Sequence, residues 1–451
     1  MKTITVYDVA RATKGDLLHA NPEKEEIKSL VTMDSRLVKE DSLFVAIKGE
    51  RVDGHDFLND VFDKGATAAI VDHVPDEIKG TLIVVKDTVK ALQDLAEWYR
   101  ESLDVKVVGI TGSVGKTSTK EVVASVLSEG FKVQKTAGNY NNEIGLPLTV
   151  LAIEEDTEIE VLEMGISDFG EMTRLSKMVR PDVSVITNIG YCHLEKLGDR
   201  DGVLKAKTEM FNYLKDDGKI VLCHDDDKLC TVEEYKGIRP IFYGTDAADE
   251  YYADKIEEQG LDGVRCTLHH GESAIGAAIP AVGRHNVLNA LCAMAVGQLY
   301  GLTDEQIAAG IASFQNVGSR NRIIKTRGMT VIDDCYNANP TSTKAGLNTL
   351  AGFGGRRVAV LGDMKELGRD ELALHKEVGA YAKEKGIDLL VAVGGLSKAT
   401  AEGFGGGAVY YPTVEDAAAQ ILSVLKEGDT ALVKASRSMH LEKIVEMLKE
   451  E

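Results

Sequence analysis

The stretch GITGSVGKTSTKE, residues 109–121, constrains the fold of this chain more than any other. It follows a run rich in β-branched residues, 105–110, and precedes apolar residues at helical spacing over 122–127. This order of strand, glycine-rich loop and helix is typical of a phosphate-binding loop, because backbone N–H groups can approach phosphate oxygens there and the helix N-terminus adds positive charge. We expect Lys116 to reach the β- and γ-phosphates and the Thr117 hydroxyl to bind Mg²⁺.

The spacing of this loop differs from the general pattern of phosphate loops. Five residues separate Gly109 from Gly115, where the general pattern has four, and Ile110 stands where a glycine is expected. A glycine-rich turn without a ligand is therefore the alternative. The flanking strand and helix are both in register, which favours the phosphate-binding interpretation.

The pattern of strand-like and helix-like segments changes twice along the 451 residues, which predicts an α/β protein of three domains. Residues 1–103 have short strands and one helical stretch, as in a small α/β unit. Residues 104–314 carry recurring strand-like runs around the phosphate loop and predict a mostly parallel sheet. Residues 315–451 alternate strands and helices again, as in a Rossmann-like unit.

Charge and composition exclude several classes of function. A net charge of −20 argues against a nucleic-acid surface, which needs a basic stripe, but permits an anionic small substrate held by local cations. We expect no stable membrane insertion and a cytoplasmic location, because there is neither an apolar run of about 20 residues nor a signal peptide. The six cysteines lack the spacing of zinc sites and are expected to be reduced thiols.

Three further residues between the loop and position 210 are candidates for chemistry. Glu163 ends an apolar strand-like run, so the carboxyl edge of a parallel sheet would place it beside a nucleotide. His193 follows another strand-like run, and Lys207 lies in the helix-like stretch LKAKTE. Each has a simpler interpretation as a solvated or structural side chain, and spacing alone would not single out Lys207.

Two polar stretches lie further along the chain. GRHNVLNA, residues 283–290, opens a helix with two asparagines, and Asn286 is either its N-cap or a ligand contact. DDCYNANPTS, residues 333–342, ends a strand in two carboxylates, with Pro340 requiring a non-helical residue before it. Polar clusters at strand ends face the ligand crevice in α/β sheets, so this stretch favours a functional interpretation.

Together these stretches resemble the Mur ligase family, the ATP-dependent amide-forming enzymes of bacterial peptidoglycan precursor synthesis. TGSVGKTS matches the family's phosphate loop, T-G-x-x-G-K-T, and this form accounts for the spacing noted above. The resemblance implies that ATP is held by the loop residues Thr111, Gly112, Ser113, Val114, Gly115, Lys116, Thr117 and Ser118.

The resemblance also implies a metal site and a modified lysine. Thr117, Glu163 and His193 fall where the family binds two Mg²⁺ ions, and Lys207 falls where it carries a carbamylated lysine, formed with CO₂, that supports a metal. Lys116, Glu163, His193 and Lys207 would then form the catalytic set.

The family's adenine and ribose segments match GRHNVLNA and DDCYNANP, which assigns Asn289 and Asp334 as nucleotide contacts. The arginine that approaches ATP after the domain linker is Arg322 or Arg320, because VGSRNRI offers both.

Within the family, the chain is similar to the branch that joins D-alanyl-D-alanine to UDP-N-acetylmuramoyl-tripeptide through an acyl phosphate. This likeness comes from GNYNNEIGLPLT (138–149), VLGDMKELG (360–368) and VKASRS (433–438), together with DDCYNANPTS. The N-terminal stretch 34–57 resembles the family's UDP-sugar-binding domain. The implied contacts of the sugar nucleotide are Ser35, Arg36, Glu50, Arg51 and Val52. Further substrate contacts are implied at Asn142, Asn337, Asn339 and Ser436. Of these, Asn337, Asn339 and Ser436 are expected to face the dipeptide.

Such an enzyme is expected to be a monomer whose three domains close around the reactants. Alternatives are a relative that adds a single amino acid, a catalytically dead relative, and a nucleotide-dependent switch. No Asn-Lys-x-Asp run for reading guanine occurs in the sequence, which argues against a GTP switch. The sequence does not distinguish lysine from diaminopimelate at the third position of the acceptor peptide.

Overall fold

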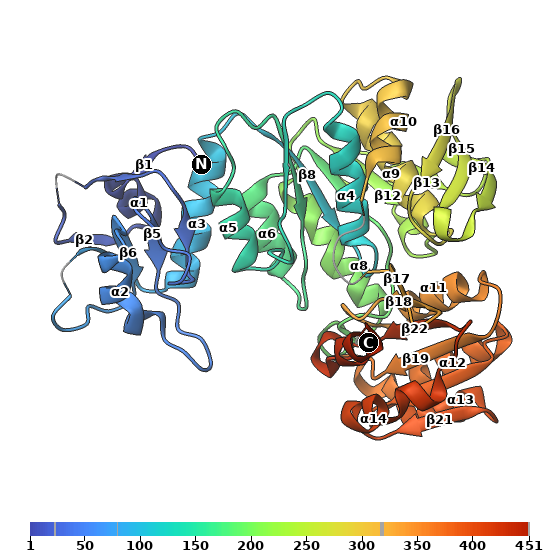
Figure 1. Cartoon of the computed structure of the whole chain (residues 1–451). Coiled ribbons are helices and arrows are strands. Elements are labelled where there is room, and N and C mark those ends of the chain that lie inside the picture. The colour runs from blue at the N-terminus through green and yellow to red at the C-terminus, as the bar shows by residue number, and fades with distance from the viewer. Residues whose placement is uncertain (22–23, 79, 316–319, 450–451) are drawn as a thin grey trace.

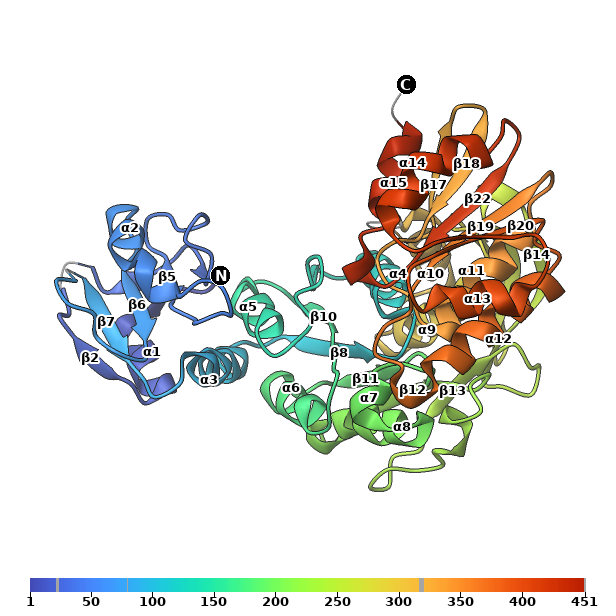
Figure 2. The same ribbon diagram turned by 90° about the horizontal axis from the view of Figure 1, so that it is seen from below.

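The computed structural model describes residues 1–21, 24–78, 80–315 and 320–449. Its main sheets lie in separate lobes, which we call the N-terminal, central and C-terminal lobes (Figure 1). The N-terminal lobe stands apart at one end of the molecule, and the C-terminal lobe packs beside the central lobe at the other (Figure 2). Among the helices of these described ranges, none is both long and apolar enough to cross a membrane.

The N-terminal lobe is built on a five-stranded sheet in the order β2-β7-β6-β5-β4. Strands β4 to β7 are parallel, β2 is antiparallel to β7, and a short pair β1-β3 lies beside them. The elements are β1 (Ile4–Thr5), α1 (Val6–Thr13), β2 (Asp16–Leu18), β3 (Glu26–Ile27), β4 (Val31–Thr32), β5 (Leu43–Val45), η1 (Gly54–Phe57), α2 (Leu58–Asp63), β6 (Ala68–Val71) and β7 (Thr81–Val84).

Helix α3 (Thr88–Glu101) connects this lobe to the next and packs against both. It contacts α1 on one side and α5 and α6 of the central lobe on the other. Its apolar stripe includes Leu92, Leu95 and Tyr99, which are fully buried. The Tyr99 hydroxyl donates to the Ile153 carbonyl oxygen at 2.7 Å, which ties the connection to the central lobe.

The central lobe contains a nine-stranded sheet in the order β16-β15-β14-β13-β12-β11-β8-β10-β9. The strands from β9 to β14 run parallel, and β14, β15 and β16 form an antiparallel ribbon. The elements are β8 (Lys106–Thr111), α4 (Lys116–Leu127), β9 (Val133–Lys135), α5 (Gly145–Leu151), β10 (Ile159–Glu163), α6 (Glu171–Val179), β11 (Val183–Ile186), α7 (Leu194–Leu197), α8 (Arg200–Thr208), η2 (Glu209–Tyr213), β12 (Lys219–Cys223), η3 (Leu229–Thr231), β13 (Ile241–Gly244), β14 (Tyr251–Glu258), η4 (Gly260–Asp262), β15 (Val264–His270), β16 (Ser273–Ile279), α9 (Asn286–Leu299) and α10 (Asp304–Ser313).

Strand β8 lies inside this sheet, between β10 and β11. Its residues from Val107 to Thr111 are all buried, as expected for a parallel strand covered on both faces. In the register of the sheet, Glu163 pairs with Ile110, and Ile186 pairs with Thr111. The carboxyl ends of the three strands therefore meet at one edge, where α/β sheets hold their ligands.

The C-terminal lobe contains a six-stranded sheet in the order β17-β18-β22-β19-β20-β21, parallel except for β17. The elements are β17 (Arg322–Thr326), β18 (Met329–Asp333), α11 (Pro340–Ala351), β19 (Arg357–Gly362), η5 (Gly368–Asp370), α12 (Glu371–Glu384), β20 (Leu389–Val393), α13 (Ser397–Phe404), β21 (Ala408–Tyr411), α14 (Val414–Val424), β22 (Thr430–Lys434), η6 (Arg437–Met439) and α15 (Glu442–Lys449).

The predicted fold class, an α/β protein with three units and mostly parallel sheets, is confirmed. The sheets fall inside the three predicted spans, 1–103, 104–314 and 315–451. The boundaries themselves stay predictions, and residues 316–319 of the second linker lie outside the described residues.

Candidate active site between the central and C-terminal lobes

A polar cavity of about 530 Å³ lies between the central and C-terminal lobes. It is lined by the loop after β8, the end of β10, the start of α9, and the segment between β18 and α11. The predicted site residues that line it are Ser113, Val114, Gly115, Lys116, Thr117, Ser118, Asn142, Glu163, His193, Asn289, Asp334, Asn337 and Asn339. Predicted residues up to 226 positions apart in the sequence, Ser113 and Asn339, thus share one cavity.

The loop after β8 has the backbone shape of a phosphate loop. Gly115 caps α4 with φ of +84°, and Gly112 has φ of +152°. A Cβ atom on Gly112 would lie 1.9 Å from the Thr187 hydroxyl oxygen, so only glycine fits there. Lys116 lies at the first turn of α4 and donates to the Gly112 carbonyl oxygen at 2.9 Å, so its side chain curls over the loop.

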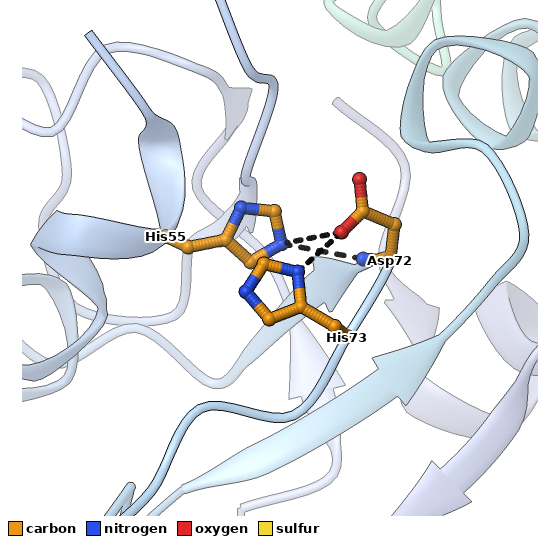
Figure 3. A group of neighbouring side chains, drawn as sticks. All are labelled: His55, Asp72 and His73. Atoms are coloured by element: carbon orange, nitrogen blue, oxygen red, sulfur yellow. Dashed lines mark hydrogen bonds and ion pairs between the residues drawn. The ribbon is translucent and has the colours of Figure 1, made fainter.

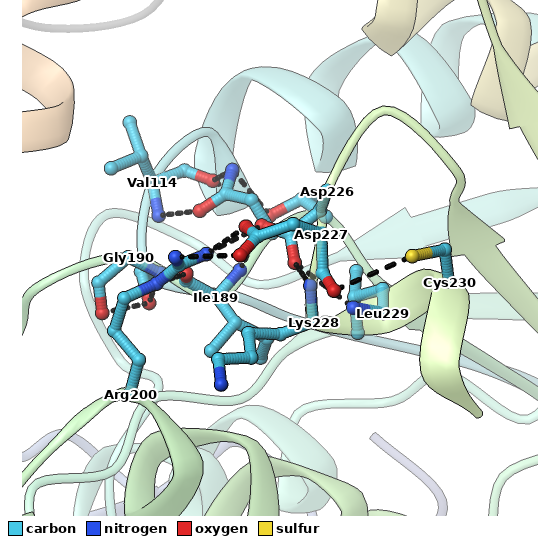
Figure 4. A network of polar contacts seen from close by, with 12 residues as sticks. Val114, Ile189, Gly190, Arg200, Asp226, Asp227, Lys228, Leu229 and Cys230 are labelled. Carbon is cyan, nitrogen blue, oxygen red and sulfur yellow. Dashed lines mark hydrogen bonds and ion pairs between the residues drawn. The ribbon is translucent and has the colours of Figure 1, made fainter.

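The loop is held in place by the segment that follows β11. Asn188 accepts from the Val114 N–H at 2.9 Å and donates to the Val114 carbonyl oxygen at 2.8 Å. Behind it, the Asp226 carboxylate accepts from the Ile189 N–H at 2.8 Å, and Arg200 donates to the Ile189 carbonyl oxygen at 2.8 Å (Figure 4). A network of hydrogen bonds that includes charged side chains therefore fixes the segment after β11, and through Asn188 it fixes the phosphate loop.

Glu163 is the centre of a buried hydrogen-bond group in the cavity. The Thr117 hydroxyl donates to its Oε2 at 2.6 Å, and the Asn141 amide donates to its Oε1 at 2.8 Å. Its own N–H donates to the Thr136 hydroxyl at 2.9 Å. Because carboxylate, hydroxyl and amide oxygens are the ligands that Mg²⁺ prefers, the side chains present fit a magnesium ion at this point.

Lys207 lies on α8, is fully buried, and does not line the cavity. Burial, with a smaller contribution from the charge of Lys116, lowers the pKa of Lys207 to about 8. No carboxylate forms an ion pair with Lys207 within the described residues. A buried lysine without an acidic partner is unusual, and the lowered pKa increases the fraction of neutral amine that can react with an electrophile.

His193 contacts the C-terminal lobe. It has a left-handed backbone with φ of 51°, directly before α7. Its Nδ1 lies 2.5 Å from Glu366 Oε2, at ion-pair distance but without the alignment of a good hydrogen bond. This contact holds the pKa of Glu366 below its usual value.

The asparagines of α9 connect to the phosphate-loop helix. The Thr119 hydroxyl donates to Asn289 Oδ1 at 2.9 Å, and Asn289 donates to Asn286 Oδ1 at 3.0 Å. Asn286 lies inside α9, and its amide donates back to the Val282 carbonyl oxygen at 2.9 Å. Of the two interpretations of Asn286, the N-cap is therefore wrong, since His285 occupies that position.

The C-terminal wall of the cavity carries a buried ion pair. Lys434 Nζ lies 2.5 Å from Asp334 Oδ2 and donates to the Asn337 carbonyl oxygen at 2.9 Å. Asn339 caps α11 by accepting from the Ser342 N–H at 2.8 Å. Ser436 does not line the cavity, and its hydroxyl accepts from the Lys365 N–H at 2.9 Å. Asn339 and Ser436 thus have structural partners in this arrangement of the lobes.

The structure separates the two candidate arginines after the linker. Arg320 lines the cavity, and its guanidinium lies 3.8 Å from the centre of the Tyr336 ring. Arg322 is exposed at the start of β17 and lines a separate small hollow instead. Arg320 is therefore the arginine that the fold brings to the predicted nucleotide residues.

The predicted sugar-nucleotide contacts are not brought to this cavity. Ser35, Arg36 and residues 50–52 lie on the N-terminal lobe, and none of them lines the cavity. The Arg36 guanidinium instead binds the Asp34 carboxylate at 2.6 and 2.8 Å and lowers the pKa of Asp34 to about 2. The lobe that carries these residues stands apart in Figure 2.

Several cavity residues were missed by sequence reasoning. Asn141 is adjacent to the predicted Asn142, and Lys434 lies within the VKASRS stretch that carried the resemblance. Asn188, after β11, also lines the cavity, and Glu366, which contacts His193 but does not line the cavity, lies in VLGDMKELG. Polar residues at the ends of strands identified these segments in the sequence, but they did not show which residues within each segment line the cavity.

Comparison with known protein families assigns three segments that make up most of the chain. Residues 28–100 match the model described as Mur ligase family, catalytic domain, residues 110–297 the Mur ligase middle domain, and residues 319–437 the Mur ligase, glutamate ligase domain. The chain belongs to the Mur ligase family. The predicted enzyme class, an ATP-dependent ligase, is thereby confirmed.

Full-length relatives extend this assignment. The chain is 41% identical to a UDP-N-acetylmuramoyl-tripeptide–D-alanyl-D-alanine ligase of Bacillus subtilis, over 98% of both chains. It is 35% identical to the enzyme of the same name from Escherichia coli, over 100% of this chain and 99% of the relative. The predicted likeness to the dipeptide-adding branch of the Mur ligases is confirmed by these relatives.

Solved structures agree with the fold. The crystal structure of MurF from Acinetobacter baumannii superposes with a TM-score of 0.93 at 32% identity, covering 100% of both chains. MurF from Thermotoga maritima in complex with ADP has a TM-score of 0.84 at 29% identity, over 94% of this chain and 97% of that one. The three-domain architecture of this Mur ligase is therefore that of MurF.

Proposed function

We propose that this Mur ligase joins D-alanyl-D-alanine to UDP-N-acetylmuramoyl-tripeptide and converts ATP to ADP and phosphate in doing so. The observation that carries the proposal is the cavity that unites Lys116, Glu163 and Asp334, in a chain similar over its full length to ligases of that name. We further propose that it acts as a monomer in the cytoplasm.

The first chemical step is transfer of a phosphoryl group. A carboxylate oxygen of the tripeptide attacks the γ-phosphorus of ATP, the bond from that phosphorus to the bridging oxygen breaks, and ADP leaves. Two anions must approach each other, so positive charge and oriented donors are needed around the phosphate. Lys116 and the N–H groups at the start of α4 would supply these, and Arg320, which lines the cavity from the C-terminal lobe, would add a further charge.

The second step is formation of the amide bond. The amine nitrogen of the dipeptide attacks the acyl carbon, phosphate leaves with the bond electrons, and the nitrogen loses a proton. We propose Asn337 and Asn142, which line the cavity, as substrate contacts, with Asn339 and Ser436 in that role only after their present partners are exchanged.

Thr117, Glu163 and His193 are the residues that we propose to hold magnesium, with two ions in total. Magnesium bound there neutralises charge on the transferring phosphoryl group. The buried group of Thr117, Asn141 and Glu163 has the oxygen ligands required. The contact of His193 with Glu366 leaves the other nitrogen of the ring available.

Lys207 is proposed to react with CO₂ and become a carbamate. The neutral amine adds to the carbon of CO₂ and loses a proton, which changes the side chain from a cation to an anion. The lowered pKa of Lys207 supports this proposal, because a neutral amine is needed for the addition. An anion at this position would also relieve the repulsion between Lys207 and Lys116.

Ser35, Arg36 and residues 50–52 are proposed to hold the sugar nucleotide on the N-terminal lobe. Their distance from the cavity means that the lobes must approach each other before the tripeptide carboxylate reaches the phosphate. Closure would also exclude water from the labile acyl phosphate.

The proposal is tested by phosphate release from ATP with Mg²⁺ and UDP-N-acetylmuramoyl-tripeptide, comparing the dipeptide with single amino acids as the amine. Release that requires the dipeptide, with a product mass equal to the pentapeptide, would support it. Release with a single amino acid would assign the chain to another branch of the family. Acceptors carrying lysine or diaminopimelate at the third position should be compared in the same assay.

A further inference from the structure

A cluster of two histidines and an aspartate lies on the N-terminal lobe, outside the cavity described above. His55 belongs to η1, and Asp72 and His73 follow β6 (Figure 3). His55 Nε2 lies 3.3 Å from Asp72 Oδ1, and His73 Nδ1 lies 2.5 Å from the same oxygen. All three ligand atoms lie within 4.8 Å of one another, and the two imidazole rings stack with centroids 4.1 Å apart.

The hydrogen bonds of His55 fix which of its nitrogens carries the proton and which carries a lone pair. Nδ1 lies 2.7 Å from an oxygen of Asp53, whose carboxylate can only accept, so Nδ1 carries the proton. The Asp72 N–H points to Nε2 at 3.3 Å, which is consistent with an unprotonated Nε2. A histidine that donates one N–H to a carboxylate and directs its other nitrogen toward further ligands has the arrangement typical of metal-binding histidines.

Charge and exposure also suit a cation. Asp72 belongs to the cluster and a second carboxylate, Asp53, borders it, while the Lys48 ammonium lies 4.0 Å from Asp53. The side chain of His55 is 4% exposed, that of Asp72 35% and that of His73 58%, so one ligand is anchored in the lobe and the others face solvent.

We propose that His55, Asp72 and His73 bind one transition-metal dication of the zinc type, with a fourth position open to water. Two imidazole nitrogens and one carboxylate oxygen are a common ligand set for Zn²⁺, and bond lengths of about 2.0–2.2 Å place ligand atoms about 3.4 Å apart. The present separation of His55 and Asp72 already has this value. The bound ion fastens η1 to the end of β6. This site is independent of the ligase function proposed above.

Binding requires two rearrangements. The Asp72 N–H must give up its hydrogen bond to His55 Nε2, whose lone pair then binds the ion. The separation between His73 Nδ1 and Asp72 Oδ1 must widen by about 1 Å. The Nδ1 proton of His73 passes through solvent to Nε2 of the same ring, so no net proton is released. The exposure of His73 permits this change without disturbing the packed part of the lobe.

Co²⁺ is the probe, because its visible absorption reports both binding and coordination geometry. The full chain, freed of metal with a chelator and then saturated with Mg²⁺ and ADP to occupy the cavity, is titrated with Co²⁺. One equivalent should bind with the intense spectrum of four-coordinate Co²⁺, and Zn²⁺ should displace it. A thiolate-to-cobalt band, or no binding in the parent, would overturn the assignment.

Two variants and a matched control complete the test. His73→Ala and Asp72→Asn should each weaken Co²⁺ binding at least ten-fold while the circular dichroism spectrum stays unchanged. His269→Ala removes a histidine that pairs with Asp254 at 2.9 Å on the distant ribbon, and should bind like the parent. Equal binding by His73→Ala and the parent would contradict the proposal.

Discussion

His193 Nδ1 lies 2.5 Å from Glu366 Oε2, and the contact joins the loop after β11 to the C-terminal lobe. The backbone supports it, because the Glu195 N–H donates to the Glu366 carbonyl oxygen at 3.5 Å. A carboxylate on one nitrogen of a histidine fixes the direction of the other nitrogen. If His193 holds magnesium, its orientation depends on where the C-terminal lobe lies.

Glu366→Gln should therefore weaken the response to magnesium. We expect the concentration of Mg²⁺ that gives half-maximal phosphate release to rise about ten-fold. Removing the hydrogen-bond partner of a metal-binding histidine typically weakens metal binding about 10- to 100-fold, and this is the lower end of that range. The KM for the sugar nucleotide should stay unchanged. Glu195→Gln is the matched control, since Glu195 is an exposed carboxylate beside the same contact. Equal magnesium dependence in both variants would contradict the orienting role.

Glu163→Gln keeps the shape of the side chain at the centre of the cavity but removes its charge. The Gln oxygen can accept from Asn141 and the Gln NH₂ can donate to the Thr117 hydroxyl, so the variant should fold, while the rate of phosphate release falls about 100-fold or more. Binding of ADP without metal, measured by calorimetry, should persist. A rate within three-fold of the parent would remove Glu163 from the proposed metal site.

Gly112→Ala tests the shape of the phosphate loop. The added Cβ would lie 1.9 Å from the Thr187 hydroxyl oxygen, so the loop must move and its N–H groups lose their alignment. We expect the affinity for ATP to fall at least ten-fold in equilibrium binding. Gly237→Ala is the control, because Gly237 also has positive φ, at 84°, but has no atom within 4 Å of the added Cβ. Similar losses of ATP affinity in both variants would show that positive φ, not the contact with Thr187, is responsible.

The phosphate loop, the strand end at Glu163 and the α/β fold could be predicted because each depends on a short stretch of sequence. The contact partners of these residues could not be predicted in this way. Asn188 reaches Val114 across 74 positions, and Glu366 reaches His193 across 173. Arg322 is the first residue of β17 and Arg320 precedes the strand, so only the path of the chain before β17 decides that Arg320 lines the cavity and Arg322 does not. Contacts of this kind depend on how lobes and loops pack.

The isolated carboxyl of Glu160 predicts a dependence of stability on pH. Burial raises the pKa of Glu160 to about 8, and its Oε2 has no hydrogen-bond partner. The folded state therefore keeps a proton that the unfolded chain releases above about pH 4.5, and stability falls as pH rises from about 4.5 to 8.

Glu160→Gln removes this titration and gives the matched comparison. The variant and the parent should unfold at similar temperatures near pH 5, and the variant should unfold at a higher temperature near pH 8. A difference in unfolding temperature that does not change with pH would contradict the raised pKa. Since Glu160 lies on β10 with Glu163 but does not line the cavity, Glu160→Gln should also retain ligase activity.

Lys207→Ala tests the proposed carbamate. The variant lacks the amine that would react with CO₂, so phosphate release should fall at least 100-fold. Acetate or formate can place a carboxylate where the carbamate would lie, so either should restore part of the activity of the variant. The same acids should not raise the rate of the parent. Lys205→Ala changes an exposed lysine of the same helix and should stay active without added acid.

In the parent, ¹³C-labelled bicarbonate should give a carbamate carbon signal in NMR spectra that Lys207→Ala lacks. If the signal is present in both proteins, the carbamate lies on another amine.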